Sequence, residues 1–296
     1  MPQPGPGEVL VRTSAVSLGN SDADSKEGSV AGFEFSGVVE ALGRGVTEPE
    51  VGTRVWGSAP NAFAEFVSAR AGHVVPIPDG LEYVDAATLS TGLFTEYGGF
   101  CRAGIKNGDT VLVTAASSGI GILGLQVARA LGATTVVGTT RNPDRIDMLT
   151  SRGADHVIVA GEGIDLAEHV RETVGGTGAD VVIDHVGGPA LRGAIEAARV
   201  GGSVVSVGRL AGPVADIDLF RLAQREVSLS SVSYGFDPPA VITNLNVGVR
   251  EYLLDSVAAG QIIATIGAVF SAGSASEAMA HLKDERSVGK VVITWR

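Results

Sequence analysis

The sequence predicts an α/β fold in which a doubly wound parallel sheet is inserted into a mainly β lobe. Short apolar strands broken by Gly and Pro fill residues 1–80, and continuous apolar strands alternate with helical segments from residue 109 onward. Strands that are apolar throughout are typical of parallel sheets covered on both faces. We expect residues 1–95 and 236–296 to form the substrate lobe and residues 96–235 the parallel-sheet domain.

The N-terminal segments have the alternation of half-buried strands. The expected strands are EVLVRTSAV (8–16), SGVVEAL (36–42), TRVWGSA (53–59) and AFAEFVS (62–68). PIPDG (76–80) predicts a turn, because Pro presets φ and Asp-Gly tolerates the reversal. A helix is expected over residues 82–104.

From residue 109 the strands and helices follow one another in a βαβ order. The expected strands are DTVLVTA (109–115), TTVVGTT (134–140), DHVIVAG (155–161), ADVVIDHVG (179–187), SVVSVGRL (203–210) and a further EVSLSSVSYG (226–235). The expected helices are 122–133, ended by Gly132, then 143–154, 165–176 and 188–202. The C-terminal part adds helices over 250–262 and 274–284 and a closing strand over 290–295.

The composition excludes several classes of protein. A net charge of −11 argues against nucleic acid or an anionic membrane as a partner. The single cysteine, Cys101, excludes an internal disulfide framework and a thiolate zinc cluster. The N-terminus lacks the features of a signal peptide and no apolar run is long enough to span a bilayer, so we expect a cytoplasmic protein.

The stretch TAASSGIG (114–121) follows an apolar strand and opens a helix, which is the context of a dinucleotide-binding turn. Ala116 and Ser118 replace the first two glycines of GxGxxG, while the last one, Gly121, is present. The backbone angle needed at each position decides whether Ala or Ser is tolerated there. We therefore expect the backbone N–H groups of this turn to bind a pyrophosphate at the helix N-terminus.

The end of the second parallel strand indicates which dinucleotide binds. An NAD site places a carboxylate there for the ribose 2′-hydroxyl, but this chain has Thr139, Thr140 and Arg141, with Arg145 one turn later. Hydroxyl and guanidinium groups suit a 2′-phosphate, so NADPH is the expected cofactor. Asp144 is the nearest acid, and it lies where it would support a helix dipole.

Two known families share the TAASSGIG phrase. It resembles the opening of short-chain dehydrogenases, but no tyrosine of this chain has a lysine four residues on. The longer resemblance is to the medium-chain dehydrogenase/reductase superfamily, in its zinc-free, quinone oxidoreductase-like (zeta-crystallin-like) branch. The motifs that carry it are PGPGEVLVRTSAVSLGNSD, GFEFSGVVEALGRGV, VGTRVWG, AFAEFV, DAATLSTGLFTEY, RGADHVI, GADVVIDHVGG and GKVVI. It implies a Rossmann domain in a GroES-like lobe, N-terminally trimmed relative to that family.

The resemblance also implies that no zinc is bound. GFEFSG follows the spacing of the zinc-alcohol-dehydrogenase signature, with Phe33 in place of the ligand histidine. The five histidines show no metal-ligand spacing, and we expect them at surface or supporting positions. For Asp184 we expect a structural role, capping the turn after its strand.

By the same resemblance, hydride passes from NADPH to a quinone or to the β-carbon of an α,β-unsaturated carbonyl. Asn20, in a corner with Asp22 or Asp24, and Tyr97 are the polar candidates for the catalytic site. Thr95 would bind the carboxamide, and Val207 and Gly208 would contact the nicotinamide ribose. The residues assigned to the cofactor are Thr95, Ser118, Gly119, Ile120, Gly121, Thr140, Arg141, Arg145, Val207 and Gly208.

Two other functions stay open at this point. The first is an enoyl-thioester reductase of the polyketide type, whose relatives usually carry a tyrosine that this chain lacks between Asn20 and Phe33. The second is a cofactor-binding tailoring or regulatory protein with little redox turnover. A small-molecule substrate is expected, and residues 227–233 are a candidate edge strand for a homodimer.

Overall fold

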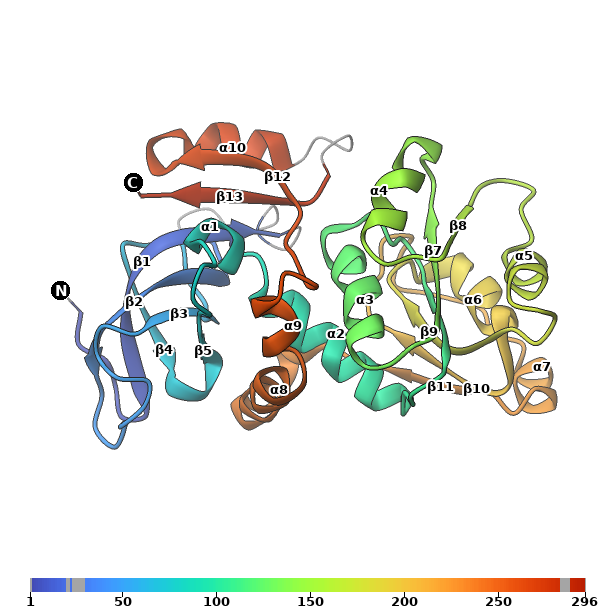
Figure 1. Cartoon of the computed structure of the whole chain (residues 1–296), viewed down its shortest axis with the longest axis horizontal. Helices are drawn as coiled ribbons and strands as arrows, with labels where there is room; N and C mark the ends of the chain where they lie inside the picture. The colour runs from blue at the N-terminus through green and yellow to red at the C-terminus, as the bar shows by residue number, and fades with distance from the viewer. Residues whose placement is uncertain (1, 20–21, 23–29, 283–287, 296) are drawn as a thin grey trace. The chain divides into compact units, whose positions relative to one another are not determined.

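The computed structural model describes residues 2–19, 22, 30–282 and 288–295. The chain forms two compact units: unit 1 comprises residues 1–94 and 238–296, and unit 2 comprises residues 95–237. In Figure 1 the chain ends, blue and red, both belong to unit 1, and unit 2 is formed by the middle of the chain.

Unit 1 is built on an antiparallel sheet with one parallel pair. Among the described residues its strands are β1 (Glu8–Leu18), β2 (Glu34–Leu42), β3 (Arg54–Ser58), β4 (Phe66–Arg70), β5 (Val74–Pro76), β12 (Ile266–Ser271) and β13 (Lys290–Thr294). They follow the order β12-β13-β1-β2-β3-β5, with β4 paired to β1. The closing strand β13 lies antiparallel to β1, so the two ends of the chain share one sheet.

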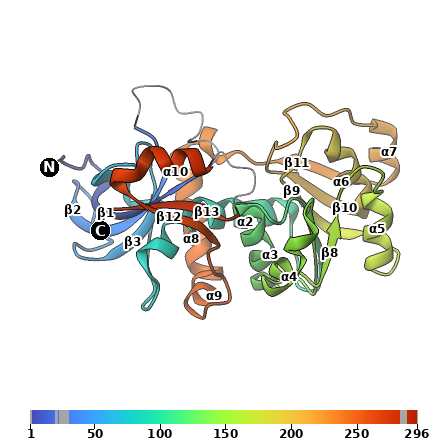
Figure 2. The ribbon, with the colours of Figure 1, turned by 90° about the horizontal axis from the view of Figure 1, so that it is seen from above.

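The helices of unit 1 come from both of its segments. They are α1 (Tyr83–Ala86), the start of α2 (Ser90–Ala103), α8 (Pro239–Tyr252), α9 (Leu254–Ala258) and α10 (Ala275–Leu282). α10 packs on β12 and β13 through Ala278, which contacts Leu18, Val291 and Ile293 in a small core (Figures 1 and 2). α8 is tied to the N-terminal segment by Asn246, whose amide donates to the carbonyl of Gly72. These contacts make one unit from sequence-distant segments.

Unit 2 is built on a parallel sheet. Its strands are β6 (Thr110–Val113), β7 (Thr135–Thr140), β8 (His156–Val159), β9 (Ala179–Asp184), β10 (Ala198–Ser206) and β11 (Ser228–Ser231). The order is β11-β10-β9-β6-β7-β8. The chain runs from β6 outward to β8 and then returns to β9 on the other side of β6, so the topology switches direction between β6 and β9.

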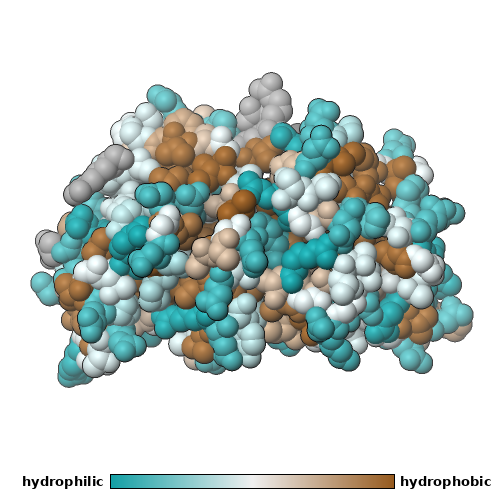
Figure 3. All heavy atoms as spheres, viewed as in Figure 1, coloured by the Kyte–Doolittle hydropathy of each residue, from teal (hydrophilic) through white to brown (hydrophobic). Residues whose placement is uncertain are grey.

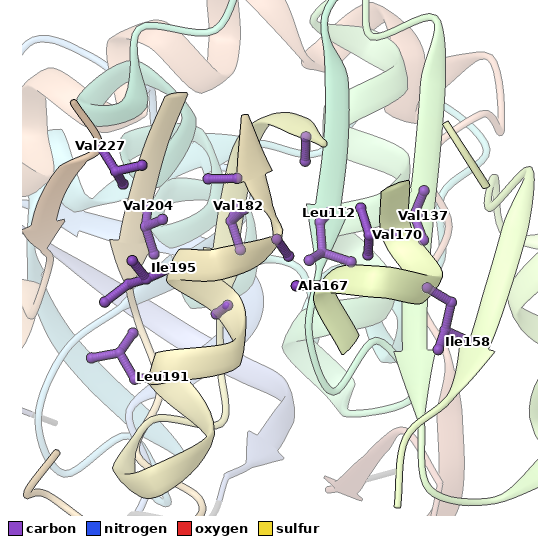
Figure 4. Packing of buried hydrophobic residues seen from close by; sticks show 14 residues of the cluster. Leu112, Val137, Ile158, Ala167, Val170, Val182, Leu191, Ile195, Val204 and Val227 are labelled. Atoms are coloured by element: carbon purple, nitrogen blue, oxygen red, sulfur yellow. The ribbon is translucent and has the colours of Figure 1, made fainter. Parts of the chain in front are cut away.

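Helices cover both faces of the unit 2 sheet, as its continuous apolar strands require. They are α3 (Gly119–Ala130), α4 (Ile146–Ser151), α5 (Leu166–Thr173), α6 (Leu191–Ala197) and α7 (Leu219–Gln224). α3 and α4 lie on one face and α5 and α6 on the other (Figure 1). Figure 4 shows the core under α5 and α6, where Val170 and Ile195 pack on Leu112, Val182 and Val204.

Several predicted boundaries differ from the structure. The helix expected over 188–202 ends at Ala197, and Ala198–Ser206 form β10, because Ala198 already pairs with Ala179 of β9. β12 and α7 were not predicted, and α8 begins at Pro239, well before the expected residue 250. The stop of α3 is confirmed, with Gly132 at φ 95° just beyond it.

The surface is mixed in character. Polar residues cover much of the face shown in Figure 3, with apolar residues among them. Exposed apolar side chains in unit 2 include Leu219 and Phe220 of α7. Within the described part of the chain, no helix has the length and apolar character needed to cross a membrane.

Candidate active site

The predicted cofactor residues of unit 2 gather where its parallel strands end. Residues 118–121 follow β6, Thr140 ends β7 with Arg141 after it, and Val207 and Gly208 follow β10. Because the strands are parallel, their carboxyl ends lie at one edge of the sheet. In open α/β sheets ligands bind at this edge, beside the point where the strand order switches direction, here between β6 and β9.

The turn after β6 explains how two glycines can be missing. The residue with left-handed backbone is Ala115, at φ 46°, and neither Ala116 nor Ser118 has a positive φ. Ser118 is the N-cap of α3, and its hydroxyl accepts a hydrogen bond of 3.1 Å from the Gly121 N–H. The two substituted positions therefore need no glycine conformation, and serine adds a helix cap.

Gly121 is required for a different reason, which is close packing. A Cβ on this residue would lie 2.5 Å from the carbonyl oxygen of Ala115 and 2.9 Å from the Cα of Ala116. The first N–H groups of α3, at Gly119 and Ile120, have no acceptor within the helix and carry its positive dipole end. The turn is therefore a backbone cradle suited to an anionic phosphate group.

β7 itself ends in hydroxyl groups, two arginines follow it, and the nearest carboxylate is that of Asp144. The hydroxyl of Thr140 is buried and lies 3.1 Å from the Ser117 hydroxyl, which ties β7 to the turn after β6. Arg141 is exposed and Arg145 is half-buried, in the short 3-10 helix Pro143–Arg145. The side-chain amide oxygen of Asn142 caps that helix by accepting from the Asp144 N–H. Arg141 and Arg145 are cationic side chains at this edge of the sheet, and guanidinium groups are suited to binding a phosphate.

Asp184, at the end of β9, organises the centre of the edge. Its carboxylate is fully buried and accepts hydrogen bonds from the Thr114 hydroxyl at 2.7 Å and from the Gly187 N–H at 2.9 Å. Its carbonyl accepts from the N–H groups of Val207 and Gly208. The expectation that Asp184 caps this turn is confirmed, and the same residue also connects β6 and β10 to β9.

A buried pair, Glu96 and His185, extends this network. His185 follows Asp184, and its Nε2 lies 2.7 Å from Oε1 of Glu96 on α2. Its Nδ1 lies 3.0 Å from the carbonyl oxygen of Thr114, and its backbone N–H donates to the Thr114 hydroxyl. Both side chains are almost inaccessible, with 2% of His185 and none of Glu96 exposed. The histidines were expected at surface or supporting positions, and His185 has a supporting position, since it is buried and hydrogen-bonded to Glu96 and Thr114.

The surroundings of His185 act on its pKa in opposite directions. Burial lowers the pKa because it disfavours the charged imidazolium. The negative charge of Glu96, the hydrogen bonds to Glu96 and Thr114 and the charge of Asp184 outweigh burial, so the pKa is raised above 6.5. The fold therefore favours the protonated ring.

The predicted catalytic candidates have different positions. Tyr97 lies on α2, half-buried, one residue after Glu96, and Thr95 lies one residue before it. Asn20 and Asp24 lie outside the described residues. Asp22 is buried in unit 1, and its carboxylate accepts from the N–H groups of Gly19 and Gly32 at 2.8 and 2.9 Å. It acts there as a turn-forming residue.

The side chains around Phe33 and the histidines bear on whether zinc can bind. Over the described ranges, no three His, Cys, Asp or Glu residues lie together in an arrangement that could hold a metal ion. Glu34, which follows Phe33, pairs with Lys290 and accepts a hydrogen bond of 2.9 Å from the Thr91 N–H. Cys101 is exposed on α2. Among the described residues, therefore, no group of side chains fits a zinc centre.

Comparison with known proteins agrees with this architecture. Residues 5–79 match the alcohol dehydrogenase GroES-like domain family, and residues 119–246 match the family described as zinc-binding dehydrogenase. A mycobacterial quinone oxidoreductase superposes with a TM-score of 0.89 at 30% identity, covering 99% of this chain and 93% of that one. The chain belongs to the medium-chain dehydrogenase/reductase superfamily.

Two further relatives of this superfamily member are informative. A mycobacterial protein complexed with NADPH superposes with a TM-score of 0.85 at 31% identity, covering 99% of this chain and 93% of that chain. A mycocerosic acid synthase-like polyketide synthase of Mycobacterium tuberculosis is 35% identical over 218 residues, which is 70% of this chain. The chain spans 10% of the length of that synthase.

The sequence of this superfamily member does not reveal that Glu96 pairs with His185, because the two residues are 89 positions apart in the chain. The signal that could have indicated a buried polar group is a polar residue at the end of a continuously apolar strand, as in VVIDHVGG (181–188).

Proposed function

We propose that this chain is an NADPH-dependent, zinc-independent reductase that transfers hydride to a quinone or to an α,β-unsaturated carbonyl compound. The observation that carries the proposal is the turn after β6, where a capped helix N-terminus and a crowded Gly121 form a phosphate cradle at the switch point of the sheet. The similarity to a quinone oxidoreductase and to a protein complexed with NADPH supports it.

We propose a residue for each part of the cofactor. Ser118, Gly119, Ile120 and Gly121 would surround the pyrophosphate, and Val207 and Gly208 would contact the nicotinamide ribose. Thr140, Arg141 and Arg145 would face the 2′-phosphate, since β7 itself ends in threonines and not in a carboxylate. Thr95 would bind the carboxamide. When bound, NADPH supplies the hydride.

The chemistry of the described residues supports the proposed acceptor class. The described residues have no fit for zinc, which alcohol oxidation in this superfamily would use to polarise a hydroxyl. Reduction of a quinone or of a conjugated double bond depends mainly on positioning and on a polarised carbonyl. Asn20 and Tyr97 are the proposed polar groups for that purpose, and a small molecule is the proposed substrate.

An enoyl-thioester reductase is the second candidate. The observation that favours it is the 35% identity to part of a polyketide synthase. The absence of a tyrosine between Asn20 and Phe33 argues against it, because the related enoyl reductases usually carry a proton-donating tyrosine there. We also propose a homodimer that pairs through β11, since β11 is an edge strand of the unit 2 sheet as described.

One experiment separates these functions. The purified full-length chain is incubated with NADPH and with three acceptor sets: quinones, enones and an enoyl thioester. We expect NADPH oxidation with the first two sets, whereas turnover confined to the thioester would assign the second candidate. Cofactor binding without oxidation of NADPH by any acceptor would show the third alternative, a binding protein.

The 2′-phosphate assignment has its own control. Arg141→Ala should weaken NADPH binding about tenfold or more, because a charge-assisted hydrogen bond contributes about 1.5–3 kcal/mol. NADH binding should stay unchanged in the same variant, since NADH has no 2′-phosphate. Equal affinity of the unmodified chain for NADH and NADPH would contradict the assignment.

A further inference from the structure

The proposed cofactor contacts give no role to the most deeply buried ionisable pair of unit 2. Glu96 and His185 are both buried and meet at 2.7 Å between Oε1 and Nε2. Burying a carboxylate is costly unless it is paired. A pair retained at that cost, next to two residues of the proposed site, needs an explanation beyond packing.

The hydrogen bonds fix how many protons the pair holds. The Thr114 carbonyl can only accept, so Nδ1 of His185 carries a proton. The 2.7 Å contact on the other side of the ring requires a second proton between Nε2 and Oε1. Loss of this shared proton would leave a buried carboxylate facing a nitrogen lone pair, with no donor between them.

The second oxygen of Glu96 shows how closely α2 approaches α3. Oε2 is buried and accepts no hydrogen bond from any described residue. It lies against Gly124 of α3, where a Cβ would come within 2.6 Å of it. The missing Cβ of Gly124 leaves room for the carboxylate at this point of α3. Among the described residues, His185 is therefore the hydrogen-bond partner that orients the Glu96 carboxylate.

The pair joins the elements that carry the proposed cofactor contacts. Glu96 lies between Thr95 and Tyr97 on α2. From His185 the hydrogen bonds continue through the Thr114 hydroxyl to Asp184. The Asp184 carbonyl in turn accepts from the residues that follow β10. One continuous network thus connects α2 with the carboxyl ends of β6, β9 and β10.

We propose that Glu96 and His185 are positioning residues for hydride transfer, and that their shared proton fixes the turn of α2 bearing Thr95 and Tyr97 against the end of β9. The inference rests on the proposed function, because it gives a reason for the placement of the carboxamide contact and of the polar group next to it. Neither residue needs to touch substrate or cofactor. Their effect is geometric, and small misplacements of reacting groups cost about 10²-fold in rate.

Three variants of the full chain test this. Glu96→Gln keeps the side-chain shape, and its amide can donate to a neutral His185. Glu96→Ala removes the bond, and Gly124→Ala leaves the pair intact in sequence but places a methyl group against Oε2. The control is Val170→Ala, which removes buried volume from the core under α5 without touching the network. NADPH affinity, kcat and Tm are measured for each.

The expected results separate positioning from stability. Glu96→Ala and Gly124→Ala should raise the NADPH dissociation constant and lower kcat by about 10- to 100-fold. Glu96→Gln should stay near the unmodified chain, and Val170→Ala should lower Tm only. Glu96→Ala with unchanged affinity and kcat, or Val170→Ala with the same losses at an equal drop in Tm, would overturn the inference.

The dependence of NADPH affinity on pH is a measurement that a packing role alone would not change. The charged groups facing His185 are Glu96 from α2 and Asp184 from β9, and the phenol of Tyr234 stays neutral because burial raises its pKa to about 12. The unmodified chain should lose NADPH affinity on the alkaline side as the shared proton dissociates. Glu96→Gln should not, and an identical alkaline decline in both would contradict the shared proton.

These outcomes are distinct from failure of the proposed function. The dissociation constant is measured without any acceptor, so the positioning role is tested even where no quinone or enone is reduced. An unmodified chain that does not bind NADPH would overturn the proposed function and this inference together. If the unmodified chain binds NADPH and Glu96→Ala has the same affinity and kcat, only the positioning inference is overturned.

Discussion

Gly121→Ala is the sharpest test of the turn after β6. The added Cβ would lie 2.5 Å from the Ala115 carbonyl oxygen and 2.9 Å from the Ala116 Cα, and both are backbone atoms. Ala115 already has φ 46°, so it has little freedom to move away. Overpacking of this kind costs about 1–3 kcal/mol, and the better helix propensity of Ala returns about 1 kcal/mol. We therefore expect the unfolding free energy to fall by about 2 kcal/mol, which is the upper overpacking cost less the gain in helix propensity.

Gly99→Ala is the matched control, also a glycine within a helix. Its Cβ would lie 3.6 Å from Cδ1 of Ile183 and 3.8 Å from Cγ2 of Val207, which are ordinary van der Waals distances. This change should stabilise the protein by about 0.5–1 kcal/mol through helix propensity and reduced freedom of the unfolded chain. The two substitutions therefore have opposite expected signs.

Urea denaturation followed by far-UV circular dichroism measures both variants. With an m-value of about 3 kcal/mol/M, a loss of 2 kcal/mol moves the midpoint down by roughly 0.7 M. Displacement of the turn should also weaken NADPH binding about tenfold or more, because its N–H groups no longer converge on one phosphate. A Gly121→Ala variant as stable as Gly99→Ala, with unchanged NADPH affinity, would refute the close-packing argument.

Three other changes follow from the same geometry. Ala115→Gly should raise the unfolding free energy by about 0.5–1 kcal/mol, and the urea midpoint with it, because it relieves a left-handed backbone that costs Ala about 1–2 kcal/mol. An unchanged midpoint would show that the turn is unstrained. Asp184→Asn should lower the unfolding free energy by about 1–3 kcal/mol, since an amide cannot accept hydrogen bonds from all the donors now bound to the buried carboxylate. In the same denaturation assay, a loss below about 0.5 kcal/mol would argue against this hydrogen-bond network. Because the pKa of His185 is raised in the folded state, protonated His185 stabilises the fold fully below pH 6.5, and this contribution is lost as the pH rises through the folded-state pKa. The unfolding free energy of the unmodified chain should therefore fall above pH 6.5, and that of Glu96→Gln should not. Parallel curves of unfolding free energy against pH would contradict this prediction.

Much of the candidate site follows from local sequence. TAASSGIG between a continuous apolar strand and an amphipathic segment predicted a phosphate-binding turn, and the structure shows a capped helix N-terminus at that place. The missing glycines did not prevent this, because the left-handed residue is Ala115 and not either substituted position. Such features depend on neighbours a few residues apart, so the printed sequence contains the information needed to predict them.

Boundaries were predicted less well where tertiary pairing overrides local preference. Ala198 continues a helical pattern in the sequence, yet it starts β10 because β9 lies beside it. The residues of β12 alternate in burial at the edge of the unit 1 sheet, and pairing with β13 makes this segment a strand. The local sequence of each segment could not reveal which strand lies beside it.

The sequence by itself determined the superfamily, the α/β order of the strands and helices and the place of the phosphate-binding turn, because strand and helix periodicity and turn chemistry are local properties. Only the tertiary structure decided that Glu96 meets His185 and that both reach Asp184 through Thr114. Those contacts join residues of different elements, up to 89 positions apart. Their partners are set by which strands and helices lie side by side, and no spacing in the sequence records that arrangement.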